Sequence, residues 1–417
     1  MSDKFAFAQE LDAQDELKHF RSRFFIPQHE GKEVIYLCGN SLGLQPKTAS
    51  EAIQKELNKW ADYGVEGHFV GEQPWWQFRK PIKPLLAEIL GAKPTEVAIM
   101  NSLTTNLHLL LVSFYNPQGK RKKVLMEAGA FPSDQYALET HLHFRGVSPD
   151  ENIIEVAPQK NEHILQTEQI LETIEKLADE LALVIFGGVN YYTGQVFEMQ
   201  KITQKAHQVG AVVGFDLAHA VGNVKLDLHA WQVDFATWCS YKYLNSGPGG
   251  VSGIFIHEKH HNKDLPRFGG WWGQVESERF LMKKGFKPIP DADGWQLSNE
   301  PILPMALHQA SLQVFHEATM DKLVAKSNLL THYLYEWLIE FAGEHIEIIT
   351  PKNPPHRAAQ LSIFAKSKGK ELHQYLLKNG IITDWREPNV VRMAPVPLYN
   401  TFTEVFLTAQ KVAEFYK

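Results

Sequence analysis

The chain has little of what marks several classes of protein. Only two cysteines, Cys38 and Cys239, occur in 417 residues, which argues against a disulfide framework and suits a reducing compartment. The longest apolar runs, such as "LALVIFGGV" at 181–189, fall far short of the roughly 20 residues that a membrane-spanning helix needs. The N-terminal segment carries acidic residues throughout and has no apolar core before a cleavage site. We therefore expect no secretory signal and a cytoplasmic location.

The chain also has no large excess of charge of either sign. The 42 basic and 48 acidic residues leave a formal net charge of −6, which offers no broad basic field to nucleic acid or an anionic membrane. The basic run "KRKK" at 120–123 is short and isolated, as is typical of a solvated loop. The histidines of "HEKHH" (257–261) lack a partner ligand at zinc-like spacing. We expect an exposed loop there, no metal site, and neither nucleic acid nor a membrane as partner.

The sequence does contain a regular alternation of strand-like and helix-like segments. Between about 95 and 260, β-rich runs alternate with amphipathic helical patterns such as 166–181. The expected strands are 97–101, 122–128, 152–158, 182–189, 210–217 and 249–257. This order predicts an α/β architecture with a mostly parallel sheet between helices. After a proline-rich stretch at 287–304, a long helical pattern at 305–343 leads into a smaller α+β region. This change in the pattern of expected strands and helices predicts a second domain.

Polar groups follow several of the expected strands, where ligands bind in open α/β sheets. The hydroxyls and backbone N–H groups of "SLTTN" (102–106) open a helix and suit a phosphate, and "GAFPSD" (129–134) offers an aromatic ring and a carboxylate. Asp216 ends another strand, with His219 three residues later. Taken singly, such groups are more often helix caps or structural side chains.

Lys242, in "WCSYKYLNSGPGG" (238–250), changes that balance. It stands among aromatic and small residues with no acidic neighbour along the chain, so we expect a buried, nucleophilic amine without a counter-ion. The glycines beside it precede a β-rich run and lack the Lys-Ser/Thr pair of a P-loop. A phosphate pocket, an aromatic ring, a strand-end acid and such a lysine together predict a site for pyridoxal 5'-phosphate. Lys242 would bond to the aldehyde, Asp216 would keep the pyridine nitrogen protonated, and Phe131 would stack on the ring.

A family resemblance rests on motifs that follow one another in a fixed order: "FPSDQYALETHL", "GVNYYTGQ", "GFDLAHAVGN", "WCSYKYLNSGPGG", "GGWWGQ" and "VVRMAPVPLYN". Together they resemble the kynureninases, fold-type-I pyridoxal phosphate enzymes, from "LCGNSLGL" (37–44) to "VPLYN" (396–400). The resemblance implies a large domain with a mainly parallel seven-stranded sheet and a smaller α+β C-terminal domain. The expected limits are 1–65 for an N-terminal segment that contributes to the small domain, 66–300 for the large cofactor-binding domain and 301–417 for the small domain.

The same resemblance assigns site residues. Lys242 and Tyr241 are the implied catalytic residues. The implied cofactor contacts are Leu103, Thr104, Phe131, Pro132, Ser133, Asp134, Gly187, Asp216, His219, Tyr241, Lys242, Trp271 and Asn299. Gly187 falls where some relatives have serine, so a side-chain contact from that position is absent. Trp271 and Asn299 would reach the cofactor across a dimer interface, which implies a homodimer with shared active sites.

The implied activity is hydrolysis of the small-molecule substrate L-kynurenine, or of its 3-hydroxy form, to L-alanine and the matching anthranilate, in tryptophan catabolism and NAD precursor synthesis. Arg392 is the expected clamp for the substrate carboxylate because guanidinium binds carboxylate bidentately; a surface ion pair is its alternative role. His68 and Asn299 would line the aromatic end of the substrate. Polar groups there favour 3-hydroxykynurenine, whose hydroxyl would satisfy them.

Other functions stay open to different degrees. An aminotransferase would present a similar cofactor site and a similar arginine, so only the product separates the two activities. A cysteine desulfurase needs a nucleophilic cysteine in the C-terminal half, and none follows Cys239. A non-catalytic binding module has no use for a desolvated lysine.

Overall fold

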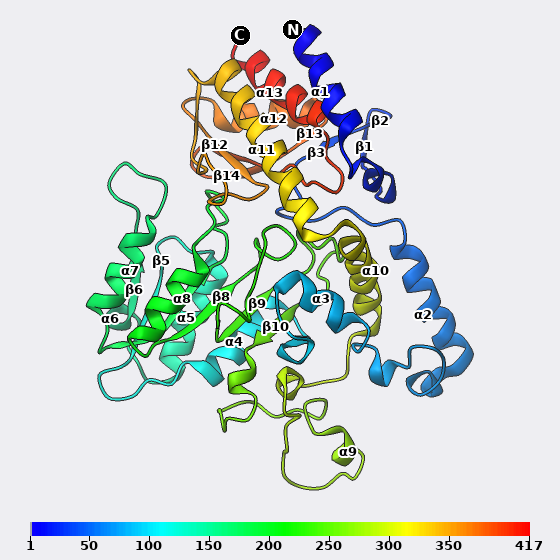
Figure 1. Cartoon of the computed structure of the whole chain (residues 1–417), viewed down its shortest axis with the longest axis vertical. Helices are drawn as coiled ribbons and strands as arrows, with labels where there is room; N and C mark the ends of the chain where they lie inside the picture. Colours follow the sequence, from blue (N-terminus) through cyan, green and yellow to red (C-terminus); the bar gives the residue numbers. More distant parts are fainter. Residues whose placement is uncertain (1) are drawn as a thin grey trace.

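The computed structural model describes residues 2–417, which form a large lower part and a smaller upper part (Figure 1). Both ends of the chain lie in the upper part, at the top of the view. None of the helices among residues 2–417 combines the length and the apolar character that crossing a membrane requires.

The large part is built on a seven-stranded sheet in the order β4-β10-β9-β8-β7-β5-β6. Its strands are β4 (Val97–Ile99), β5 (Lys123–Glu127), β6 (Ile153–Val156), β7 (Leu181–Gly187), β8 (Val212–Asp216), β9 (Phe235–Trp238) and β10 (Gly253–Ile256). Strand β10 runs antiparallel to its neighbours β4 and β9, while β9, β8, β7, β5 and β6 pair in parallel. The predicted mainly parallel sheet is confirmed, although the short strand β9 was not among the expected runs.

Helices cover both faces of this sheet, and strand β7 shows why. All its residues from Leu181 to Phe186 are buried, as expected of a parallel strand with two covered faces. Leu183 and Ile185 enter one hydrophobic core, and Val184 and Phe186 enter the other. The helices of this part are α2 (Ala49–Tyr63), α3 (Ile82–Leu90), α4 (Leu103–Phe114), α5 (Pro132–Phe144), α6 (Pro149–Asn152), α7 (Thr167–Lys176), α8 (Met199–Gln208), α9 (Glu276–Arg279) and α10 (Ile302–Ala318).

The small part is assembled from both ends of the chain. Its antiparallel sheet has the order β11-β12-β15-β14, formed by β11 (Ile346–Ile348), β12 (Leu361–Ala365), β15 (Val390–Met393) and β14 (Asp384–Arg386). Around it lie α1 (Ser2–Gln14), α11 (Met320–Ala342), α12 (Gly369–Lys378) and α13 (Phe402–Tyr416), while β3 (Ile35–Tyr36) pairs with β13 (Ile381–Ile382) and β1 (Gln28–His29) pairs with β2 (Lys32–Glu33). Asp12 accepts a hydrogen bond from the backbone N–H of Phe402, 390 residues away.

The helical pattern at 305–343 is divided between two helices. Thr319, with φ at 61°, interrupts it between α10 and α11. Helix α10 packs on α2 and α3, and its Leu312 belongs to a core of the large part, whereas Leu330 of α11 belongs to the core of the small part. The change from one core to the other therefore lies near residue 319. The limits 1–65, 66–300 and 301–417 stay a prediction.

The expected exposed loop at 257–261 is wrong, because His257, His260 and His261 are all buried. Asp234 binds His260 at 2.8 Å, which holds the segment against β9. His257 lies close enough to Glu96 and His229 for a shared metal ion. The ring of His257 already accepts a backbone hydrogen bond at Nδ1 from Lys259, and Glu96 accepts one from Glu258. These acceptor atoms of His257 and Glu96 therefore hold the backbone of the segment in place.

Candidate active site

A pocket at the carboxyl ends of β5, β7 and β8 brings together most of the predicted site residues. It is lined by Leu103, Thr104, Glu127, Phe131, Ser133, Asp134, Gly187, Val189, Tyr191, Asp216, Ala218, His219, Cys239, Tyr241 and Lys242. The fold positions them at the edge where ligands bind in open α/β sheets.

Lys242 is half-buried, and its Nζ lies 3.1 Å from Nε2 of His219. Burial, and then the charge of Lys242, hold the pKa of His219 well below its ordinary value, so the imidazole is neutral. The Lys242 amine then donates to Nε2, and the imidazole proton sits on Nδ1. That Nδ1 is buried and has no hydrogen-bond partner within residues 2–417.

Two carboxyl groups lie beside this pair. Asp216, at the end of β8, accepts a hydrogen bond from the backbone N–H of Ala218 at 2.7 Å. Burial, and then the neighbouring Asp216, raise the pKa of Asp134 well above its ordinary value, while Lys242 lowers the pKa of both acids. The two acids interact directly, and the raised pKa of Asp134 favours a proton on that carboxyl. The expectation that Lys242 lacks acidic neighbours is therefore wrong, because folding brings acids from distant strands and helices.

The other end of the pocket suits a phosphate. Helices α4 and α5 begin there at Leu103 and Pro132, and neither start has a side-chain cap. Oγ1 of Thr104 and Oγ of Ser133 are hydrogen-bonded at 2.6 Å, which joins the two helix starts. Hydroxyls and uncapped N–H groups at helix N-termini attract anions. Pro132 has no N–H to offer and does not line the pocket.

This donor set fits pyridoxal phosphate. Oδ1 of Asp134, like Nδ1 of His219, is buried without a partner in the described part of the chain, and such atoms call for a polar ligand. The amine of Lys242 stands 5.7 Å from the centre of the Phe131 ring. That ring is 43% exposed and free to cover a flat ligand.

Some predicted residues lie elsewhere in the single chain. His68 is half-buried, and its Nδ1 lies 3.1 Å from the backbone oxygen of Val65. Trp271 is 40% exposed and donates to the backbone oxygen of Arg279. Asn299 lines a different pocket, beside Gly249. The roles of His68, Trp271 and Asn299 stay predictions.

Arg392 is buried on β15 and does not line the Lys242 pocket itself. Its Nη2 is ion-paired with Asp384, its facing residue on β14, and its Nη1 donates to the backbone oxygen of Tyr191 at 2.6 Å. Tyr191 does line the pocket, so Arg392 contacts a residue of the pocket wall without lining the pocket itself. The carboxylate clamp stays a prediction.

Sequence reasoning missed some residues of the pocket. Glu127 ends β5, and the strand-end argument that selected Asp216 would have selected it from the expected strand 122–128. Tyr191 stands inside the motif "GVNYYTGQ", but nothing in its type or spacing distinguishes it from Tyr192. Cys239 and Val189 were also missed, and they carry no chemical signal in the sequence.

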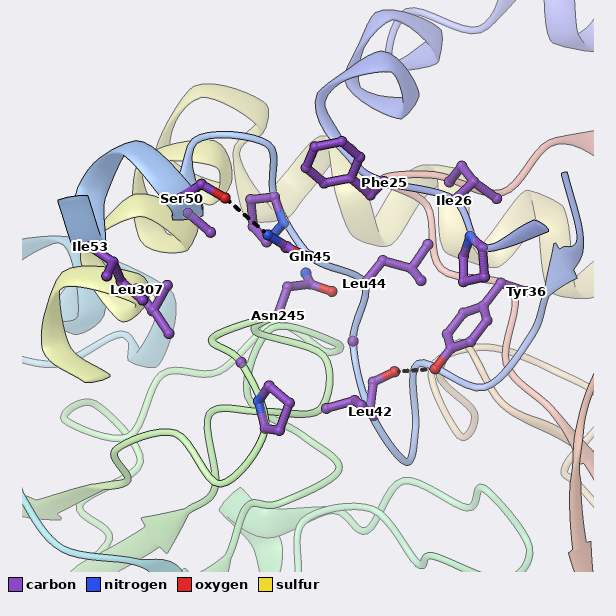
Figure 2. A pocket seen from close by; sticks show the side chains of 16 residues that line it. Phe25, Ile26, Tyr36, Leu42, Leu44, Gln45, Ser50, Ile53, Asn245 and Leu307 are labelled. Carbon is purple, nitrogen blue, oxygen red and sulfur yellow. Dashed lines mark hydrogen bonds between the residues drawn. The ribbon is translucent and has the colours of Figure 1, made fainter. Parts of the chain in front are cut away.

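A second cavity, of about 470 Å³, lies between the N-terminal segment and the loop that follows Lys242. Figure 2 shows mainly apolar side chains around it, including Phe25, Leu44 and Leu307. The Tyr36 hydroxyl in its wall donates to the backbone oxygen of Leu42. Nothing in this lining resembles the set of acids, amine and imidazole in the Lys242 pocket.

Comparisons with known proteins agree with this geometry. The closing part of the chain, residues 323–412, matches the family model for the kynureninase C-terminal domain. A cystine C–S lyase bound to its product cysteine persulfide shares the fold, with a TM-score of 0.75 at 17% identity over 91% of this chain and 97% of that one. A cysteine desulfurase from Thermococcus onnurineus gives a TM-score of 0.74 at 17% identity over 92% and 94%. The predicted fold class is confirmed.

Curated relatives resemble the chain from end to end. The kynureninase of Flavobacterium psychrophilum is 55% identical over 404 residues, covering 96% of this chain and 95% of the relative. The kynureninase of the animal Nematostella vectensis is 47% identical, covering 96% and 91%. With such identity over nearly its whole length, the chain belongs to the kynureninase family.

Proposed function

We propose that this chain hydrolyses the bond between Cβ and Cγ of L-kynurenine or 3-hydroxy-L-kynurenine, giving L-alanine and the matching anthranilate, with pyridoxal 5'-phosphate held at Lys242. The observation that carries the proposal is one pocket that joins the Lys242 amine to His219, to the Asp134 and Asp216 acids, and to a polar end formed by two hydroxyls at two helix starts. Identity of 46–55% to curated kynureninases supports the same conclusion.

Lys242 has two tasks in this scheme. Its amine would hold the cofactor through a covalent link to the aldehyde, and when free it would move a proton at the substrate Cα. Bound there, pyridoxal phosphate supplies an electron sink for the charge that develops on the substrate. The neutral His219, 3.1 Å from Nζ, accepts a hydrogen bond and orients the amine between these tasks.

Asp216 and Tyr241 act on either side of that chemistry. The carboxylate of Asp216 pairs with the pyridine nitrogen and keeps it protonated. Burial raises the pKa of the Tyr241 phenol, so the hydroxyl stays protonated and serves as a proton donor when water adds to the substrate carbonyl. Thr104 and Ser133 hold the phosphate through their hydroxyls and the uncapped helix starts.

Arg392 binds the substrate carboxylate in the proposed complex. Its guanidinium already faces Asp384, and Asp384 also faces Arg386 at 3.2 Å. Two cations on one carboxylate leave a surplus positive charge, which an incoming carboxylate can neutralise.

A homodimer completes the site in this proposal. The segment around α9 exposes Phe268, Trp271, Phe280, Met282 and Phe286, more apolar surface than a monomer ordinarily leaves uncovered in one segment. This segment projects from the bottom of the large part, away from the small part (Figure 1). A second copy would cover it and would receive Trp271 and Asn299 at its own cofactor.

The finer biological assignments belong to the same proposal. We place the enzyme in the cytoplasm, in tryptophan catabolism and the supply of NAD precursors. We also propose 3-hydroxykynurenine as the better substrate, because polar groups from His68 and Asn299 would pair with its ring hydroxyl.

The decisive experiment is product analysis of the purified protein with pyridoxal phosphate and each kynurenine. We expect equal amounts of alanine and an anthranilate, together with a visible absorbance band of the lysine-bound cofactor that borohydride removes. Release of a keto acid would instead support an aminotransferase. Lys242→Ala is the matched control and should give neither the band nor the products.

A further inference from the structure

Glu127 is a buried acid in the Lys242 pocket to which the proposed mechanism gives no task. It is the last residue of β5 and only 6% exposed. Its carboxyl oxygens lie 3.1 and 3.3 Å from the backbone N–H of Gly187, the last residue of β7. Gly187 in turn pairs in register with Asp216 on β8. The strand ends therefore place a carboxyl, a glycine and a second carboxyl in one row.

The surroundings of Glu127 differ from those of the buried acids in the Arg79 region. Glu300 is paired with Arg79, and Asp293 with Lys83, whereas the hydrogen bonds of the Glu127 carboxyl within residues 2–417 come from backbone N–H groups. Burial, and then Asp216, raise the pKa of Glu127 from its ordinary value of 4.5 to about 7. Other titratable groups lie around it on several elements. They are Asp134 from α5, Cys239, Tyr241 and Lys242 from the segment after β9, His219 after β8, Tyr191 and Tyr192 after β7, and Glu162 and His163 across an adjoining cavity.

The space around the carboxyl depends on residue 187. A Cβ built on Gly187 would lie 3.1 Å from Oε1 of Glu127 and 3.4 Å from the backbone oxygen of Val189. A side chain at 187 and the Glu127 carboxyl therefore compete for the same volume at the pocket wall. Because residue 187 is glycine, the Glu127 carboxyl occupies this volume. The backbone N–H groups use acceptor lone pairs of the acid and none of its donor capacity, and the carboxyl lines the Lys242 pocket.

We propose that Glu127 is a further cofactor-binding residue, whose carboxyl O–H donates a hydrogen bond to the pyridoxal phosphate at Lys242 from the space that Gly187 leaves open. This inference rests on the proposed function, since it needs that cofactor. It explains why a third carboxyl stands in a pocket whose lysine is already matched by Asp134 and Asp216.

The first test uses the protein without cofactor and so does not depend on activity. Between pH 4.5 and about 7, unfolded Glu127 releases its proton while folded Glu127 keeps it, so its contribution to stability falls as pH rises through that window and is constant above it. The unfolding midpoint of the wild type should therefore fall by about 2–5 °C relative to Glu127→Gln across this range. Glu155→Gln, an exposed change on the neighbouring strand β6, is the control and should run parallel to the wild type. If the unfolding midpoints of the wild type and Glu127→Gln changed in parallel with pH, Glu127 would not be protonated in the folded protein and the proposal would be wrong.

The second test measures the dissociation constant of pyridoxal phosphate. Glu127→Gln keeps a donor and should bind within about threefold of the wild type, whereas Glu127→Ala should bind roughly 2- to 12-fold more weakly, the range expected for one hydrogen bond. Gly187→Ser in the Glu127→Ala background returns a hydroxyl to the same space and should recover the loss. Equal binding by wild type and Glu127→Ala, or equal weakening by Gln and Ala, would refute the donor role. Failure of the wild type to bind the cofactor would refute the proposed function, and this proposal with it, whatever the first test gives.

Discussion

Charged residues are buried in two regions of the large part, and the regions differ in how completely the charges are paired. Around Arg79, the guanidinium contacts Asp293, Glu300 and Glu276 at 2.6–2.9 Å, and Lys83 adds a second cation at 2.8 Å from Asp293. Around Lys242, three acids face one half-buried amine, and polar atoms of Asp134 and His219 lack partners within residues 2–417. A complete set of partners indicates a structural role, and an incomplete set indicates a place for a ligand.

The comparison predicts opposite outcomes for the two central cations. Lys242→Ala should leave the unfolding midpoint nearly unchanged and abolish turnover, because proton transfer alone contributes about 10²–10⁴-fold. Lys242→Arg keeps the charge and should be equally inactive, since guanidinium does not form the covalent link. Kinetics and thermal unfolding on the same samples check both. Retention of more than a tenth of the wild-type rate would remove Lys242 from the mechanism.

Arg79→Met should act on stability. It leaves the buried Glu300 without a cation, and breaking a buried ion pair costs about 3–5 kcal/mol of unfolding free energy. Urea unfolding measures the loss. Lys80→Met is the matched control, because Lys80 is exposed and lies 3.9 Å from Glu276. A loss of less than 1 kcal/mol would show that complete pairing does not distinguish the two regions.

Two aspartates sharpen the contrast. Asp216→Asn should lower turnover roughly 10- to 100-fold, the range expected for a hydrogen bond to a charged group, with little loss of stability. Asp234 instead has protein partners, His207 and Lys259, each at 2.8 Å, so Asp234→Asn should lower stability and leave kcat unchanged. If Asp216→Asn lowered mainly stability and Asp234→Asn lowered mainly turnover, the distinction between the two regions would be wrong.

The smallest expected effect concerns His68, which belongs to neither region in the single chain. If a second copy brings it to the substrate ring, His68→Phe should reduce the preference for 3-hydroxykynurenine over kynurenine roughly 2- to 12-fold, the net value of one hydrogen bond. The measurement is kcat/KM for both substrates. A wild-type preference for plain kynurenine, or a preference that the substitution leaves unchanged, would confine His68 to its contact with Val65.

The sequence was sufficient where a single residue stands out from its local surroundings. Asp216 could be selected at a strand end and Lys242 by its aromatic and small neighbours, whereas Glu127, also at a strand end, was missed. The apolar runs predicted most of the large sheet. Pairing in space could not be predicted in the same way. The acids that face Lys242, and the burial of His257 and His260, depend on segments far apart in the chain. The break at Thr319 was also hidden, since the helical pattern continues on both sides of it.

The small part of the molecule cannot complete its folding before the C-terminal residues have been synthesised. Strand β3 needs β13, and Asp12 needs the start of α13, 390 residues later. During synthesis, the sheet of the large part is complete once β10 has emerged, while the first segment of the chain must wait without its partners. The long closure adds a slow, late step to folding. A ribosome that stalled in the last fifty or so codons would therefore leave a finished large sheet beside an unpaired N-terminal segment.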